Sequence, residues 1–345
     1  MLRHAFFFAA SVPLFACSAS MRRGVNTTEA ATGLEQVTRS SENEFDPAVS
    51  RDGSSVAYEV AASPDALPHV GAMSLKDVGS RAPSRPAYES KDATGLEPAW
   101  MPDTSGVVFA SSARGSGGLV QTIGPSIDRT AFLAKAGDPG MIASWPAISP
   151  DGRTVAMSLR KVELFRSGWR TFTPFDAALG VSDLEGSGVT ILGAGTDPAW
   201  SPHGRRLAFS RTVDGRAHVF LANADGSAAQ QITDGPDDDV RPTWSPDGRF
   251  IAFCSEHSET GWTQANLFVI HADGSGLIQL TEGDRVACRP AWGADGFIYF
   301  HANATDRFHI WRIRPVGDLA GPASPTPPTG GAALGLQGRT QDPSA

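Results

Sequence analysis

Short apolar stretches separated by tight polar turns fill most of this chain, and the pattern returns about every 48 residues. In its clearest copy, Pro242-Thr-Trp is followed by the turn Pro246-Asp-Gly and the apolar run Phe250-Ile-Ala-Phe. A polar loop then leads to Ala265-Asn-Leu-Phe-Val-Ile, and a second turn leads to Leu277-Ile-Gln-Leu-Thr. The turn glycines supply the positive φ of tight hairpins, and the apolar runs suit pleated strands. Each copy therefore predicts four short antiparallel strands.

The same phrase occurs six times, each time with a proline where the first strand begins. These prolines are Pro47, Pro98, Pro146, Pro198, Pro242 and Pro290, so their spacings are 51, 48, 52, 44 and 48 residues. A period of this length fits one four-stranded blade of a β-propeller and is too long for a helical repeat. We therefore predict an all-β chain that forms a single six-bladed β-propeller of four-stranded blades.

The last repeat shows only three strands, and the missing strand is predicted at the other end of the chain. Gly33-Leu-Glu-Gln-Val-Thr matches Gly276-Leu-Ile-Gln-Leu-Thr, which is the fourth strand of the fifth repeat. An open ring would leave unpaired strand edges, so we expect this N-terminal strand to pair with the last blade and close the ring.

The segments around the repeats define the predicted domain organisation. Residues 1–17 are interpreted as a lipoprotein-type signal peptide, 18–33 as a linker, 34–315 as the propeller and 316–345 as a disordered Pro/Gly-rich tail. The apolar run from Ala5 to Ala16 is too short to span a bilayer, which favours an export signal.

Leu14-Phe-Ala-Cys resembles the bacterial lipobox, in which the cysteine, here Cys17, is lipidated. The alternative is ordinary cleavage after Ala19. We expect an exported protein on the periplasmic side of the outer membrane, held to the membrane by its lipid alone. In that compartment Cys254 and Cys288 are a candidate disulfide, because both lie at the same end of adjacent blades.

Composition and motifs argue against several classes of function. The formal net charge of −8, with no basic stripe to offset it, argues against nucleic acid as a partner. The sequence has no G-x-S-x-G nucleophile elbow and no H-E-x-x-H, and its eight histidines are scattered. We predict no catalytic residue, no metal site and no cofactor, and we expect a monomer.

The fourth and fifth repeats resemble the TolB-type family of WD-like propeller repeats. The resemblance rests on the shared sequence of Trp-Ser-Pro, a turn glycine, Ala-Phe, Ala-Asp-Gly-Ser and Gln-Ile/Leu-Thr, here from Trp200 to Thr233 and from Trp244 to Thr281. It covers the propeller only, because the α/β domain that precedes the propeller in TolB is not found between Cys17 and the closing strand. It implies a binding scaffold of the cell envelope whose partner is an envelope protein of the peptidoglycan-associated lipoprotein type.

Two groups of aromatic and charged residues are candidates for structure or binding. The tryptophans at one strand position of the repeat, Trp100, Trp200, Trp244 and Trp292, are interpreted as packing between neighbouring blades. The residues before the six repeat prolines should stand around one mouth of the central channel, and these are Asp46, Glu97, Trp145, Asp197, Arg241 and Arg289. They could bind a small polar ligand or the charged end of a partner, or they could satisfy one another as a ring of salt bridges.

The longest excursion from the repeat runs from residue 160 to residue 177. Its Arg166, Trp169, Arg170 and Phe172 are candidate partner-binding residues, because aromatic residues and arginine dominate interface hot spots. The alternative is a loop folded back onto its own blade. Since strands alternate in direction, we expect this loop and the channel mouth to lie on the same face, opposite the short Asp-Gly turns.

The sequence therefore favours a non-enzymatic, TolB-like scaffold for protein–protein interaction. The alternative is a propeller enzyme or a carbohydrate-binding module with its site at the central channel mouth.

Overall fold

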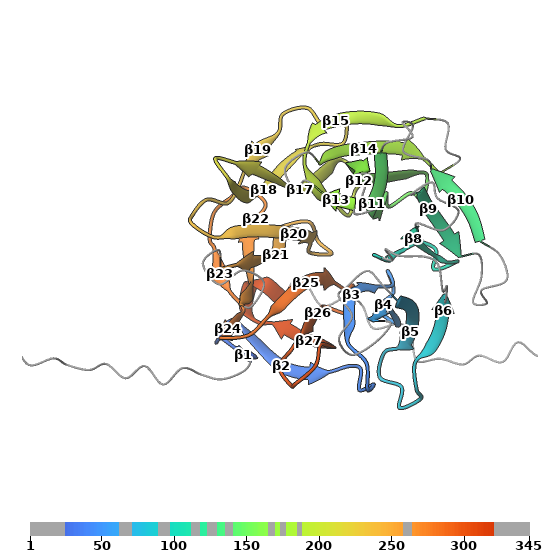
Figure 1. Ribbon diagram of the computed structural model, residues 1–345. Helices are drawn as coiled ribbons and strands as arrows, with labels where there is room; N and C mark the ends of the chain where they lie inside the picture. Colours follow the sequence, from blue (N-terminus) through green and yellow to red (C-terminus); the bar gives the residue numbers. More distant parts are fainter. Residues whose placement is uncertain are drawn as a thin grey trace, which may run out of the picture.

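Twisted antiparallel sheets radiate from a central axis, as the blades of a propeller do (Figure 1). The computed structural model describes residues 25–61, 71–88, 97–111, 118–122, 130–134, 141–164, 170–172, 177–184, 188–257 and 264–320. In the blades that follow chain order, the first strand of each repeat lies innermost and the fourth lies outermost.

The strands of the first three blades are as follows. The first contains β3 (Glu44–Val49), β4 (Ser55–Ala61), β5 (Gly71–Asp77) and β6 (Arg85–Tyr88). The second contains β7 (Ala99–Trp100), β8 (Val107–Ser111), β9 (Gly118–Thr122) and β10 (Thr130–Ala134). The third contains β11 (Met141–Ile148), β12 (Thr154–Leu164), β13 (Arg170–Phe172), β14 (Ala178–Asp183) and β15 (Thr190–Ala194).

The remaining strands complete the ring. The fourth blade contains β16 (Thr196–Trp200), β17 (Arg206–Val213), β18 (Arg216–Asn223) and β19 (Gln230–Gln231). The fifth contains β20 (Asp238–Trp244), β21 (Phe250–Glu256), β22 (Ala265–His271) and β23 (Ile278–Gln279). The last contains β25 (Ala287–Trp292), β26 (Ile298–Ala302), β27 (His309–Pro315) and β2 (Ala31–Gln36), and a short 3-10 helix, η3 (Gly317–Ala320), follows β27.

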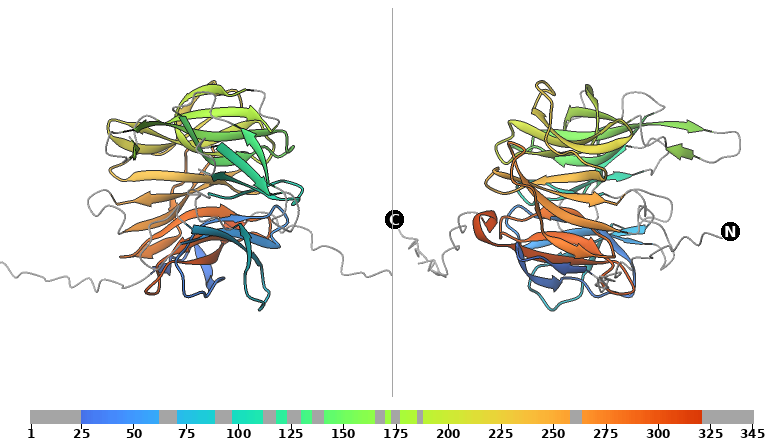
Figure 2. Two further views of the ribbon diagram at one scale, coloured as in Figure 1. Left: turned by 45° about the vertical axis from the view of Figure 1, so that its right-hand side comes forward. Right: turned by 90° about the vertical axis from the view of Figure 1, so that its left-hand side faces the viewer.

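The prediction of six four-stranded blades is wrong. Within the described residues five blades have four strands, whereas the sheet that contains β11 and β12 has five. The physical reason is the length of β12, which has 11 residues and extends beyond its neighbour β14. The protruding end, Val162–Leu164, pairs with β13 and forms an additional hairpin. This hairpin stands out from one face of the disc, and η3 lies on the opposite face (Figure 2).

The N-terminal strand closes the ring, as predicted. β2 pairs antiparallel with β27, from Ala31 opposite Pro315 to Gln36 opposite Trp311. The preceding strand β1 (Val25–Thr27) pairs with β24 (Thr281–Gly283), which follows the fifth blade. The N-terminal segment is therefore hydrogen-bonded to two consecutive repeats.

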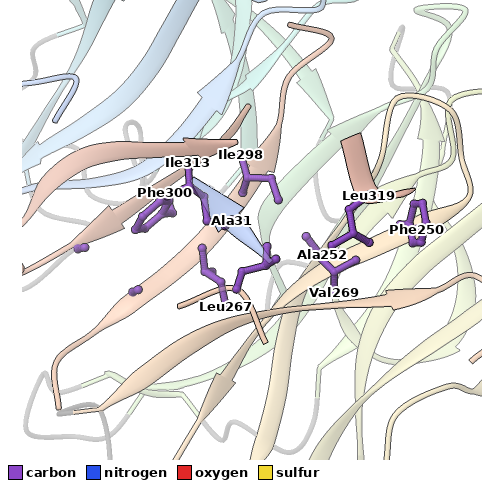
Figure 3. Close-up of a cluster of buried hydrophobic side chains, with 12 residues drawn as sticks. Ala31, Phe250, Ala252, Leu267, Val269, Ile298, Phe300, Ile313 and Leu319 are labelled. Atoms are coloured by element: carbon purple, nitrogen blue, oxygen red, sulfur yellow. The ribbon is translucent and has the colours of Figure 1, made fainter. Parts of the chain in front are cut away.

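Buried side chains between neighbouring blades form the core. Figure 3 shows one such cluster, in which Ala31 of β2 lies with Phe300 and Ile313 of the last blade and with Leu267 of the fifth. All four are at most 2% exposed. Ring closure therefore buries apolar surface as well as pairing a strand edge.

The recurrent tryptophans join adjacent blades, as predicted from their register. The indole N–H of Trp100 donates to the carbonyl oxygen of Ala48 in the preceding blade at 3.0 Å. Trp200 and Trp244 make the equivalent bonds, at 3.1 Å each, to Ala147 and Ala199. Trp292 packs against the cluster shared by the fifth and last blades. These side chains serve the scaffold.

No helix in the part of the chain that the structure describes has the length and hydropathy needed to cross a bilayer.

Deleting residues 18–39 should lower the free energy of unfolding by more than about 4 kcal/mol, because β27 loses its partner and the cluster around Ala31 opens. Chemical denaturation measures this change, and light scattering reports the aggregation expected of an exposed strand edge. Glu35→Gln is the control, since it removes only the exposed ion pair with Arg312 and should cost about 0–1 kcal/mol. Equal stability of the deletion variant and this control would contradict the role of β2.

Candidate functional site

The residue before each repeat proline has a left-handed backbone. Their φ values are 49° for Asp46, 32° for Glu97, 51° for Trp145, 52° for Asp197, 58° for Arg241 and 62° for Arg289. In five of the blades the strand register shifts at this point, which marks a β-bulge. Proline is tolerated at the bulge because the ladder is interrupted there and needs no N–H from this residue. A positive φ in a non-glycine residue costs about 1–3 kcal/mol, so such a conformation persists only where the surroundings enforce it.

The neighbouring blade supplies part of that enforcement. At three junctions the displaced backbone N–H donates to a side chain on the second strand of the preceding blade. Ser158 accepts the N–H of Asp197 at 2.9 Å, and Ser210 accepts that of Arg241 at 3.1 Å. An equivalent hydrogen bond joins the last blade to the first, where His301 accepts the N–H of Asp46 through Nδ1 at 3.2 Å.

At the junction between the second and third blades, a different kind of residue accepts the displaced N–H. The residue of the second blade at the equivalent position is Ala110, which has no acceptor. Instead Glu97 reaches across the junction, and its Oε2 accepts the N–H of Trp145 at 2.6 Å. A side chain predicted to face a ligand therefore also holds the backbone of its neighbour in place.

The six pre-proline residues do converge, and together they line one cavity of about 520 Å³ on the propeller axis. The cavity runs along the inner strands from these residues to the turns between the first and second strands. Its mouth is lined by turn residues of successive blades, namely Arg51, Pro102, Pro150, Pro202, Pro246 and Ala294. Repeat prolines, alanines and the edges of the recurrent tryptophans line the wall between them.

This geometry corrects the expected face. The pre-proline residues were expected to open toward the long loops, but the cavity that they line extends from them toward the short turns, where Arg51 and Pro246 are exposed. The β12–β13 hairpin, which carries the long excursion, projects from the opposite face (Figure 2). The two candidate surfaces are therefore separate.

Ion pairs link the charged residues among the six pre-proline residues, which form the floor of the cavity. Arg289 Nε lies 2.9 Å from Asp46 Oδ1, and Arg289 Nη1 lies 4.0 Å from Asp197 Oδ1. The same guanidinium stacks on Trp145, with Cζ 3.4 Å from the ring centroid. The second floor arginine, Arg241, pairs with Glu256, which comes from β21.

The floor has an excess of negative charge. Three carboxylates and two guanidiniums give the pre-proline ring a formal charge of −3 + 2 = −1, and Glu256 makes it −2. Burial lowers the pKa of Arg289 to about 10, and the nearby Arg241 acts in the same direction. At neutral pH Arg289 is still protonated, so the excess remains negative.

His301 is uncharged at the closing junction. Burial lowers the pKa of His301, although the nearby Asp46 carboxylate opposes the shift. The neutral ring can present an unprotonated Nδ1, which is what accepting the Asp46 N–H requires.

The other predicted residues are not among those that line the cavity, and some of them lie outside the described residues. Cys254 and Cys288 form a disulfide with a Cα separation of 5.1 Å. The predicted lipidation site Cys17 and the loop residues Arg166 and Trp169 lie outside the described residues. Arg170 and Phe172 belong to β13, where the structure describes the backbone only.

A group of potential metal ligands lies beside the floor. Among the described residues Cys254, Glu256 and Cys288 bring their ligand atoms within 4.8 Å of one another. The two sulfurs are bonded to each other and Glu256 pairs with Arg241. An oxidised cysteine pair offers no thiolate, so this group is a structural one.

Sequence reasoning missed the side chains that accept the pre-proline N–H groups. They occupy one repeat position, the last residue of Val-Ala-Met-Ser158, Leu-Ala-Phe-Ser210 and Ile-Tyr-Phe-His301. A polar residue that recurs at one register of an otherwise apolar strand is the signal that could have found them.

Comparisons with known proteins agree on a propeller. The TolB beta propeller domain matches residues 166–318. A TolB homolog of Chlorobium chlorochromatii is 33% identical over 117 residues, which are 33% of this chain and 24% of that protein. The match thus spans about a quarter of the relative.

Solved structures resemble this chain in fold. A structure from Agrobacterium tumefaciens, provisionally assigned as TolB, has a TM-score of 0.59 at 15% identity and covers 83% of this chain and 100% of its own. An oligogalacturonate lyase from Vibrio parahaemolyticus has a TM-score of 0.54 at 11% identity and covers 85% of this chain and 98% of its own. At these identities the likeness concerns the fold alone.

Replacing Arg289 by Met should lower the free energy of unfolding by about 3–5 kcal/mol, because Asp46 loses the guanidinium that compensates its buried charge. Adding Asp46→Asn should recover part of this loss in a double-mutant cycle. Arg249→Met is the matched control, since Arg249 pairs with Asp247 at the exposed surface and should cost less than about 1 kcal/mol. A loss no larger than that of the control would mean that the floor ion pair is unimportant for stability.

Proposed function

We propose that this chain, which matches the TolB beta propeller domain over residues 166–318 and has a propeller fold, is a non-enzymatic scaffold of the cell envelope that mediates protein–protein interaction. The partner is an envelope protein of the peptidoglycan-associated lipoprotein type. It inserts a charged end into the axial cavity.

The cavity carries this proposal. A preformed concave site with an apolar wall and a few buried polar groups is the usual form of a binding site. The formal charge of −2 at the floor favours an inserted group that is positive, such as a lysine or arginine side chain. The floor groups are engaged with one another, as Arg289 is with Asp46 and Glu97 is with the Trp145 amide, which favours recognition over proton transfer.

We further propose that the chain is exported and lipid-anchored through Cys17 at the periplasmic side of the outer membrane. The Cys254–Cys288 disulfide supports export, because disulfides persist in oxidising compartments. The β12–β13 hairpin is proposed as a second contact on the opposite face. Its candidate residues are Arg170 and Phe172 of β13, and Arg166 and Trp169 from the stretch of sequence before β13.

Site-specific photocrosslinking in the native envelope tests the cavity. A benzophenone side chain at Ala294, in the cavity mouth, should form an adduct with an envelope lipoprotein that mass spectrometry identifies. The same probe at Ile191, which is 55% exposed on the outer strand β15, should not. Adducts with the same protein from both positions, or from Ile191 alone, would contradict insertion into the cavity.

The charge of the floor is tested in the same experiment. Asp197→Asn should lower the yield of the adduct from Ala294 by about tenfold, corresponding to roughly 1.4 kcal/mol of lost attraction. Asp214→Asn, in the exposed turn between β17 and β18, is the control and should leave the yield unchanged. An unchanged yield with Asp197→Asn would rule out a cationic end at the floor.

Replacing Cys17 by Ala should move the protein from the membrane fraction to the soluble periplasmic fraction, because stable anchoring needs the acyl chains that this cysteine would carry. Fractionation followed by immunodetection measures the distribution, and labelled fatty acid should enter the wild type only. Tight membrane association of the variant would mean that another anchor exists.

The alternative is a propeller enzyme or carbohydrate-binding module that uses the same cavity. The observation that favours it is an open cavity in which three carboxylates meet, because such groups could bind or act on a sugar. Calorimetric titration with neutral and acidic oligosaccharides, oligogalacturonate included, distinguishes the two. Binding that Asp197→Asn abolishes, together with no adduct from Ala294, would favour the alternative.

A further inference from the structure

The strand positions that hold the pre-proline backbone are equivalent in consecutive blades. Ser158 lies opposite Ser144, Ser210 opposite Thr196 and His301 opposite Cys288 in the strand registers. Each of these partners immediately precedes the pre-proline residue of its own blade. In the fifth blade the same register places Cys254 opposite Val240, which precedes Arg241.

Cys254 therefore occupies the position that a serine hydroxyl occupies in the third and fourth blades. The next pre-proline residue is Arg289, and Cys254 has no hydroxyl to offer to it. Cys254 is instead bonded to Cys288, the residue immediately before Arg289. Both cysteines are at most 2% exposed. The junction between the fifth and last blades is therefore held by a covalent bond. The two neighbouring junctions are held at the equivalent position by hydrogen bonds.

The disulfide also meets the other floor arginine. Arg241 Nη1 donates to Cys288 Sγ at 3.2 Å, and the same nitrogen pairs with Glu256. Arg241 and Arg289 supply both positive charges of the pre-proline ring. The disulfide thus touches one guanidinium and is adjacent in the chain to the other.

We propose that the Cys254–Cys288 disulfide is a positioning element that holds both floor guanidiniums in their ion pairs. It takes over at this junction the role that Ser158 and Ser210 play at the two preceding ones. Without it the backbone at Arg289 would be released from the fifth blade, and Arg289 Nε would leave Asp46 Oδ1 more often. This role does not depend on whether a partner enters the cavity.

Two double variants of the full chain separate positioning from general stability. Cys254→Ala/Cys288→Ala removes the covalent bond and leaves no acceptor, whereas Cys254→Ser/Cys288→Ala restores the hydroxyl found in the third and fourth blades. The readout is hydrogen exchange of the Arg289 Nε–H, followed by NMR, because this proton reports how often its ion pair opens. Ile313→Val, in the buried cluster of the last blade, is the control for a loss of stability remote from the floor.

We expect protection of the Arg289 Nε–H to fall by about tenfold or more in the Ala/Ala variant and to be largely retained in the Ser/Ala variant. Ile313→Val should lower the melting temperature without a selective change at Arg289. If the Ala/Ala variant does not fold, reduction of the folded wild type with a phosphine provides the same comparison. Unchanged protection in the Ala/Ala variant, or equal loss in both double variants, would overturn the proposal.

Discussion

The backbone N–H of the residue before each repeat proline is the group on which the channel depends. The β-bulge removes this N–H from its own ladder, and a buried N–H must find another acceptor. At three junctions the acceptor is a side chain of the preceding blade, Ser158, Ser210 or His301. The conformation that directs side chains toward the axis is therefore a joint property of two adjacent blades.

This dependence explains why charge gathers at one level of the channel. The bulge recurs at one point of each repeat, so the side chains it redirects meet in a single ring. Arg289 then lies between Asp46 of the first blade and Asp197 of the fourth and stacks on Trp145 of the third. Residues from distant repeats therefore compensate one another at this level of the channel.

Departures from the repeat show how the ring tolerates variation. Ala110 cannot accept the next N–H, and Glu97, which precedes β7, supplies the acceptor instead. Cys254 replaces a serine and forms a covalent bond instead. β12 extends beyond β14 and pairs there with β13. This additional pairing begins at Val162, after the pairing of β12 with β14 has ended, so the four-stranded part of the blade is unchanged. In each case the junction to the next blade is preserved while the chemistry differs.

The spacing of the prolines and the apolar runs by themselves determined the propeller, the inner strands, the ring-closing strand and the convergence of the pre-proline residues. These follow from local periodicity and from the need to pair strand edges. The count of strands in the third blade could not be predicted, because β13 pairs with the overhanging end of a strand whose length the repeat does not set. Only the tertiary structure decided that the cavity opens among the short turns, that Arg289 pairs with Asp46, and that His301 holds the Asp46 amide. Such contacts join blades that are distant in the chain, so their geometry is set by ring closure. The polar residue that recurs as Ser158, Ser210 and His301 marks a position in the sequence but does not identify its partner.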